Sequence, residues 1–481
     1  RSHCDWSSDV CSSDLKWYAG DDLTFTFGFR YDKVLTPDYP HLNPKFLERN
    51  GIGNNQRFDF DLIQPRVSFN YDASSMFGDR VVDATIRGGR GLFLGRIPRV
   101  WYGNAYSRSG GLTDYNRFRS YSDVIGPMPA SSTADPHFFW LGPTSNYEVR
   151  SAWYGDAQGT DPSFEAPSSW RTNIALDLLT TKGYDFTVEY NRDQINEGVF
   201  YQDLGITQTG TLADGRGTYT GAGDFWLSNT ELGDTEAITF IMKKEWNDVK
   251  FMTAYTNMDA SDVYALTAAQ AESAYGYQEG WDGESMSANR SSFMVEHEFL
   301  ATLDYTTQLL GDNDTRFSLV FVRKAGEPYS VVFDEPGYNS VSGNSRFYAD
   351  YSLAYIPTGA SDPNVSFTSS AVASAVMDHV NSTGLSAYKG SHAPRNAFNS
   401  PWYSRLDLRI TQDINVFDDH KIIVYLDLLN LLNMIDDEKG IVREYGYNNS
   451  RQILVDGVTS TGQFIISGVD QIGRASCRER V

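Results

Sequence analysis

Cysteine, basic residues and long apolar runs are all scarce in this chain of 481 residues. The cysteines are Cys4, Cys11 and Cys477, so nothing between the two ends predicts a disulfide framework or a thiolate metal site. Lys and Arg total 40 against 62 Asp and Glu, and the net charge of -22 argues against a nucleic-acid partner. No apolar run approaches the ~20 residues of a membrane helix, which excludes a helical membrane protein but not a β-barrel.

The two ends of the chain resemble translated DNA adapters of the kind used in short-read sequencing. Residues 5–15 and 473–481 each back-translate without a break into such an adapter. We therefore expect residues 1–15 and 472–481 to be adapter-derived and residues 16–471 to be native. The native part has no cysteine, and its net charge remains -22 because the excluded ends carry four acidic and four basic residues.

Period-two alternation of apolar and polar residues is the dominant pattern of the native part. In residues 23–31, leucine, phenylalanine and tyrosine occupy the odd positions, and threonine, glycine and arginine the even ones. The same alternation recurs at 184–191, 299–306, 405–410 and 422–428. It predicts β-strands with one polar face in water and one apolar face, with aromatic residues near its ends, in lipid.

The connections between these strands alternate between short and long. Short turns are expected at about 73–81, 181–183, 247–248, 310–315 and 416–420. Long excursions are expected at about 34–57, 96–169, 194–235, 259–290 and 324–401. Outer-membrane barrels have short periplasmic turns and longer extracellular loops, because successive strands cross in opposite directions.

The sequence therefore predicts an all-β fold, an antiparallel transmembrane β-barrel present in part. About eleven crossings are expected, from 22–33 through 421–433, and residues 434–471 would begin another long loop. A helical pattern at 371–380 lies inside the longest excursion, so we expect this helix outside the membrane.

Several of these strands also carry motifs of a known family. Residues 28–32 resemble the recurrent Gly-x-Arg-Tyr-Asp strand of TonB-dependent outer-membrane receptors, in particular their Oar-like branch. Residues 64–72 and 87–98 resemble the two strands that usually follow, and residues 402–433 resemble the strand pair near the end of the barrel. The resemblance extends in order over residues 22–433, so we expect 16–471 to be a partial receptor barrel.

The resemblance implies a barrel of about 22 strands with an N-terminal plug and a short peptide that the TonB complex pulls. Neither of these is identifiable here, nor is the family's C-terminal strand ending in an aromatic residue. The implied partners are outer-membrane lipid, the TonB complex through the missing N-terminal part, and an unknown extracellular ligand.

The polar motif residues favour a structural role. Arg30 with Asp32, and Arg405 with Asp407, share one strand face, so they are expected to point into the lumen and pair with opposite charges on neighbouring strands, or else to contact a ligand. The glycines at 88–91 allow close backbone approach or a bulge, and they lack the spacing of a phosphate-binding loop.

The long loop at 96–169 is the best candidate for ligand contact, because tyrosine and tryptophan combine apolar area with a hydrogen-bonding tip. The same residues could instead pack the loop. The candidates are Trp101, Tyr102, Tyr106, Tyr115, Phe138, Phe139, Trp140, Trp153 and Tyr154. No enzyme motif, cofactor site or metal site is predicted, and the Asp312-Asn313-Asp314 turn lacks the spacing of a calcium loop.

The leading hypothesis is an outer-membrane receptor of a Gram-negative cell that binds a substrate with its loops and imports it with TonB-coupled energy. Two alternatives remain open, a passive porin or surface adhesin barrel and a soluble carbohydrate-binding β-protein. The chain lacks the plug, so it is not expected to be active alone. Expressed by itself, it is also expected to aggregate, because part of a barrel leaves two open strand edges.

Overall fold

The protein is described here by a computed structural model. It describes residues 7–36, 38–96, 98–109, 157–221, 223–263, 266–282, 287–335, 351–417, 420–470 and 477–480. No helix in these ranges is long and apolar enough to span a membrane.

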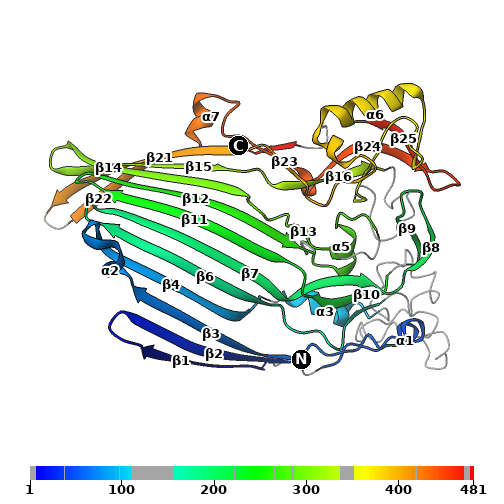
Figure 1. The fold of residues 1–481 in the computed structure, drawn as a ribbon, viewed down its shortest axis with the longest axis horizontal. Helices are drawn as coiled ribbons and strands as arrows, with labels where there is room; N and C mark the ends of the chain where they lie inside the picture. Colours follow the sequence, from blue (N-terminus) through cyan, green and yellow to red (C-terminus); the bar gives the residue numbers. More distant parts are fainter. Residues whose placement is uncertain are drawn as a thin grey trace, which may run out of the picture.

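One large antiparallel sheet dominates the structure (Figure 1). Its main path contains twelve strands, and each strand pairs with the next one along that path. The strands are β1 Ser7–Tyr18, β2 Leu23–Leu35, β3 Phe60–Asp72, β4 Val81–Leu94, β6 Ser168–Thr180, β7 Tyr184–Asp203, β11 Asp234–Glu245, β12 Val249–Asp262, β14 His297–Leu310, β15 Asn313–Lys324, β21 Tyr403–Phe417 and β22 His420–Leu428. This up-and-down order is that of a barrel wall, with β1 and β22 at its two open edges.

The eleven strands from β2 to β22 confirm the predicted crossings. The short connections also fall where they were expected, as at residues 181–183 and 311–312, where Gly183 and Gly311 adopt φ of 72° and 64°. Strand β1 was not predicted, and most of it lies in the segment assigned to an adapter. It pairs with β2 through the backbone, and an open strand edge offers such pairing to any extended chain. The adapter assignment itself stays a prediction.

The smaller elements lie in the long connections or after β22, apart from α2 Ser74–Phe77 and the 3-10 turn Gly78–Arg80 between β3 and β4. The helices are α1 Pro44–Asn50, α3 Arg99–Ser107, α5 Ala271–Gly276, α6 Ser370–Ser382 and α7 Leu431–Ile435, with 3-10 turns at Gly384–Tyr388 and Gly446–Asn448. The strands are β5 Gln158–Thr160, β8 Thr207–Thr211, β9 Gly217–Thr220, β10 Phe225–Thr230, β13 Asn289–Arg290, β16 Pro328–Asp334, β17 Tyr355–Ile356, β18 Val365–Phe367, β19 Ser391–His392, β20 Phe398–Asn399, β23 Val442–Tyr445, β24 Asn449–Val458, β25 Phe464–Val469 and β26 Cys477–Arg480.

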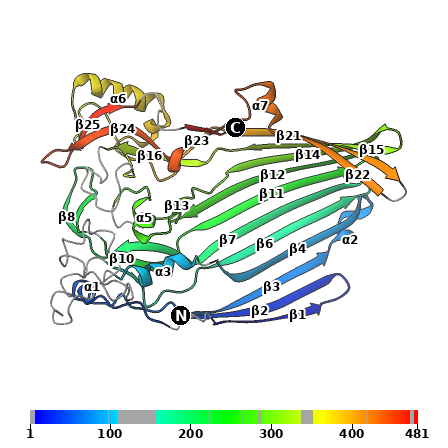
Figure 2. The ribbon, with the colours of Figure 1, turned by 180° about the vertical axis from the view of Figure 1, so that it is seen from behind.

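The two ends of the sheet differ sharply. Figures 1 and 2 show the short turns at one end of the long strands and most of the loop elements gathered at the other. Helix α6 lies in the longest excursion, as predicted from residues 371–380. Residues 449–469 also fold at this end, where β24 and β25 form a five-stranded sheet with β16, β18 and β20.

The two faces of the main sheet carry different side chains. Ile174, Tyr190 and Ile238 lie directly opposite one another on β6, β7 and β11, so they share one face. On the other face, Ala175 lies opposite Glu189, which lies opposite Thr239. Ile174 is 48% exposed, and no second sheet is stacked on this apolar face within the described residues.

Candidate functional site in the outer loops

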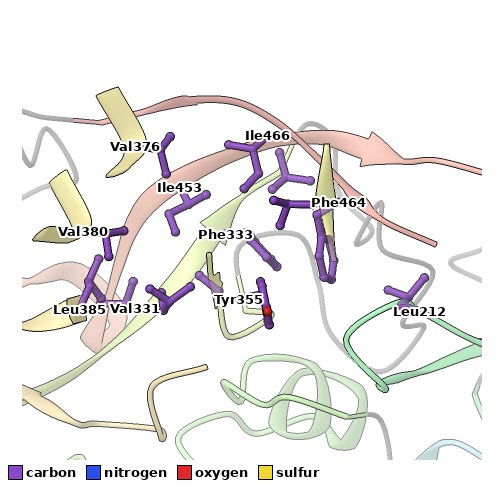
Figure 3. Packing of buried hydrophobic residues seen from close by; sticks show 14 residues of the cluster. Leu212, Val331, Phe333, Tyr355, Val376, Val380, Leu385, Ile453, Phe464 and Ile466 are labelled. Carbon is purple, nitrogen blue, oxygen red and sulfur yellow. The ribbon is translucent and has the colours of Figure 1, made fainter. Parts of the chain in front are cut away.

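The outer loops have a hydrophobic core of their own. We call the elements outside the main sheet at its loop end the loop body. Around Phe333 and Phe464, whose ring centroids are 4.7 Å apart, residues from β16, β24, β25 and α6 pack together (Figure 3). In α6, Val376 and Val380 are four residues apart and point from one face of the helix into this core. The loop body therefore folds by burial, as a soluble domain does.

A second core joins loops that are far apart in the sequence. Phe58 precedes β3, Tyr102 lies on α3, Phe164 precedes β6, Tyr201 lies on β7 and Tyr275 lies on α5. The rings of Phe58 and Tyr102 stack at 4.4 Å between centroids. Because the buried side chains of this core are divided among four long connections, no single loop forms it alone.

Three of the nine predicted ligand contacts lie in the described residues, all on α3. Tyr102 is 6% exposed and belongs to the second core. Trp101 and Tyr106 are partly exposed and pack against that core, and the Tyr106 hydroxyl donates to the Asp38 carbonyl oxygen at 2.8 Å. Six further candidates lie outside the described residues, namely Tyr115, Phe138, Phe139, Trp140, Trp153 and Tyr154.

A buried carboxylate connects three of the long loops. Helix α1 begins after Asn43, whose side chain accepts hydrogen bonds from two backbone N–H groups, and it ends at Gly51 in the left-handed conformation. This placement brings Arg49 to Asp224, with 2.6 Å between guanidinium and carboxylate. The Ala157 backbone N–H also donates to Asp224, at 3.2 Å.

A cavity of about 210 Å³ lies inside the loop body, and its lining includes Glu279, Trp281, His392 and Arg395. The Trp281 and His392 rings stack at 5.3 Å, and Arg395, 3% exposed, pairs with Asp262 at 2.5 Å. Burial of the carboxyl group raises the pKa of Glu279 to about 7, although the residue as a whole is partly exposed. Burial also lowers the pKa of His392 to about 4, so this imidazole is neutral at neutral pH.

Sequence reasoning missed this cavity. Its residues come from the loop before β14 and the loop before β21, and no spacing motif connects them. Of the Asp312-Asn313-Asp314 segment, Asp312 lies in the tight turn between β14 and β15, and the other two residues begin β15. Across the described ranges, no group of three or more His, Cys, Asp or Glu residues is placed to hold a metal ion.

Charged residues on the inner face of the wall form ion pairs. Arg87 on β4 reaches Asp177 on β6 at 2.8 Å and Glu189 on β7 at 3.0 Å, as expected for opposite charges on neighbouring strands.

Two motif pairs differ from the prediction of pairing between strands. Arg30 pairs with Asp32 at 2.6 Å and Arg405 with Asp407 at 2.8 Å, in each case within one strand. Residues two apart lie on the same face, and the long arginine side chain spans the distance between them. Asp32 additionally accepts a hydrogen bond from Gln64 on β3.

Comparisons with known proteins give structural likenesses only. No protein-family model matches the chain, and no curated protein matches it. The siderophore receptor PirA from Acinetobacter baumannii is similar at 11% identity and a TM-score of 0.42, covering 89% of this chain and 42% of that protein. The outer membrane transporter YddB from Escherichia coli is similar at 9% identity and a TM-score of 0.44, covering 96% and 52%.

The copper transporter OprC is similar at 10% identity and a TM-score of 0.39, covering 92% of this chain and 43% of that protein. The chain thus spans about half the length of these proteins or less. All three TM-scores are below 0.5.

Proposed function

We propose that this chain forms part of the wall and outer loops of an outer-membrane receptor of a Gram-negative cell, which binds a ligand outside the cell and transports it inward. One observation carries the proposal. The apolar face of the main sheet is uncovered, with Ile174 48%, Phe240 50% and Ile63 62% exposed. In water such a face would cost about 25 cal/mol for each Å² of apolar area, whereas in lipid it costs nothing.

Two exposed tryptophan side chains indicate the levels at which the lipid layer would end on the wall. Trp246 follows β11 at the turn end of the sheet and is 51% exposed, and Trp402 precedes β21 at the loop end and is 50% exposed. Tryptophan is favoured where apolar and aqueous layers meet, because its ring is apolar and its N–H is polar. The wall between these two levels lies in the membrane, and the loop body lies outside the cell.

Ligand contact is assigned to the long loop that follows β4. Of its described aromatic residues, Trp101 and Tyr106 keep exposed surface, whereas Tyr102 is committed to packing. The assignment extends to Tyr115, Phe138, Phe139, Trp140, Trp153 and Tyr154 of the same loop. Long loops on a rigid sheet are suited to this role because they vary without disturbing the wall.

We propose further that the receptor belongs to the Oar-like branch and that the TonB complex supplies the energy for transport. Both are supported by the strand motifs at 28–32, 64–72, 87–98 and 402–433. Transport would require a plug and a TonB-contacting peptide upstream of these strands. A passive porin or adhesin barrel would share the wall but would lack both.

The experiment is to express the gene with its own upstream region in a Gram-negative host and to fractionate the cells. We expect the protein in the outer membrane, released by detergent and not by buffer, with a folded form that migrates differently on unheated gels. Release into buffer alone would identify a soluble β-protein and overturn the proposal. An upstream sequence without a plug would overturn the TonB-coupled part and leave a passive barrel.

A further inference from the structure

A hollow of about 670 Å³ lies on the inner face of the wall, separate from the loop cavity. Its lining residues come from β1, β2, β3, β4, β6, β7 and β11. Arg66 on β3, Gly91 on β4 and Arg171 on β6 are direct cross-strand partners, so they share one face of the sheet. This is the inner face, and most of the lining residues hold positions on it. The hollow therefore opens toward the lumen.

Glycines on β4 form the floor of the hollow. A Cβ atom at Gly89 would lie 2.8 Å from the Val67 carbonyl oxygen, and one at Gly91 would lie 3.0 Å from the Arg66 Cβ and the Phe93 ring. Side chains at these two inward positions would thus collide with the neighbouring strand and fill the space. This close approach is the role predicted for the glycines at 88–91.

Of the five arginines on the lining, Arg66, Arg87 and Arg171 hold inward positions beside this floor. Arg87 is held by the two carboxylates described above, and Arg171 pairs with Asp193 at 2.9 Å. The other lining carboxylate is Asp14, which belongs to the segment predicted to be adapter-derived. Carboxylates thus neutralise Arg87 and Arg171, and among these three arginines the charge of Arg66 has no ion-pair partner within the described residues.

Arg66 differs from the other two arginines. Within the described residues it has no ion-pair partner, and its Nε atom is buried without a hydrogen bond. Its guanidinium lies 5.6 Å from the centroid of the Phe93 ring, and that of Arg171 lies 5.7 Å from the same centroid. Phe93 thus holds both guanidinium groups beside the hollow, where one of them still lacks an acceptor.

We propose that this hollow binds an anion, a carboxylate or phosphate group carried by a small ligand in the lumen, with Arg66 as its principal contact. A planar guanidinium donates two parallel hydrogen bonds to such a group. Asn191 on the lining donates one amide N–H to Glu189 and has a second N–H to offer. The volume is in the range of small-molecule sites. The proposal deepens the proposed function, on which it rests, by naming an anionic ligand class.

The test uses the complete protein purified from outer membranes in detergent, with citrate and pyrophosphate as probes and sucrose as the neutral control. We expect both anions to bind, more weakly as salt rises, and sucrose not to bind. Arg66→Gln should weaken anion binding at least about tenfold, and Arg66→Lys should weaken it less because the charge remains. The matched control is Arg323→Gln, which removes an exposed arginine whose guanidinium lies over the Trp402 ring, and it should leave binding unchanged.

Equal anion binding by wild type and Arg66→Gln would overturn the proposal, as would absence of anion binding by the wild-type protein. In the latter case, cross-linking from Arg66→Cys to another segment of the protein would show that this segment occupies the hollow. These failures are distinguishable from failure of the proposed function, because the protein would still fractionate with the outer membrane.

Discussion

The wall and the loop body treat apolar side chains in opposite ways. In the wall, Phe240 is 50% exposed on an uncovered face, whereas in the loop body Phe333 is fully buried among residues of several loops. Both regions are made of β-strands and aromatic residues, so composition does not separate them. The difference follows from the surroundings of each region. Apolar side chains of the wall can face lipid, whereas those of the loop body face water unless they pack against one another.

The largest expected effect is on solubility. Expressed alone and without detergent, this chain should aggregate, because the uncovered apolar face and the open edges at β1 and β22 expose apolar area and unpaired backbone groups to water. Size-exclusion chromatography checks this outcome. A monodisperse monomer in plain buffer would show that the apolar face of the wall is covered by protein, as the apolar residues of the loop body are.

The next effect separates the stability of the two regions. Phe333→Ala should destabilise the loop body by about 3–5 kcal/mol, because it opens a cavity beside Phe464. Phe293→Ala is the matched control: Phe293 is 68% exposed, and its loss should cost less than about 0.5 kcal/mol. Hydrogen exchange should show the loss in loop amides and not in strands β2 to β22. Equal loss of protection in the wall would mean that the two regions unfold as one unit.

A charge placed on either face of one strand tests the orientation of the wall. Phe240→Lys should destabilise the folded protein in bilayers by about 2–4 kcal/mol, because the ammonium group would face lipid. Thr239→Lys, one residue away on the inner face and opposite Glu189, should have a much smaller effect. Unfolding by urea in lipid vesicles measures both variants. If Thr239→Lys proved the more costly one, the assignment of faces would be reversed.

The smallest effect depends on pH and is confined to the loop body. The pKa of Glu279 is raised from 4.5 to about 7, so between these values the unfolded chain loses a proton that the folded chain retains. Ionisation then favours unfolding, and stability falls as pH rises from about 4.5 to 7. Glu279→Gln should stabilise the loop body by about 1–2 kcal/mol at about pH 8, a value reduced for partial exposure, and should leave it unchanged near pH 4.

Thermal unfolding of the complete protein at these two pH values measures the difference. Glu438→Gln, at an exposed carboxylate beyond α7, is the control and should be neutral at both. His392 contributes with the opposite sign, because its lowered pKa makes stability fall as pH drops from about 6.5 to 4. A Glu279→Gln gain of the same size at both pH values would show that the effect does not come from ionisation.

Much of the candidate site could not be predicted. Tyr102 was expected to contact a ligand or to pack its loop, and the structure stacks it on Phe58 from a different loop. No local sequence pattern marks the cavity around Glu279 or the unpaired guanidinium group of Arg66. Each depends on which distant segments meet, and residue spacing within one loop contains no information about its neighbours.

The sequence by itself determined the strands of the wall, their faces and the alternation of short turns with long loops. A strand's side chains alternate with period two whatever lies beside it, so residues 23–31 and 184–191 specify both faces locally. Only the tertiary structure decided how the loops pack, which aromatic residues they bury and where a guanidinium is left without an acceptor. These features depend on contacts between distant segments, which register and loop closure fix together.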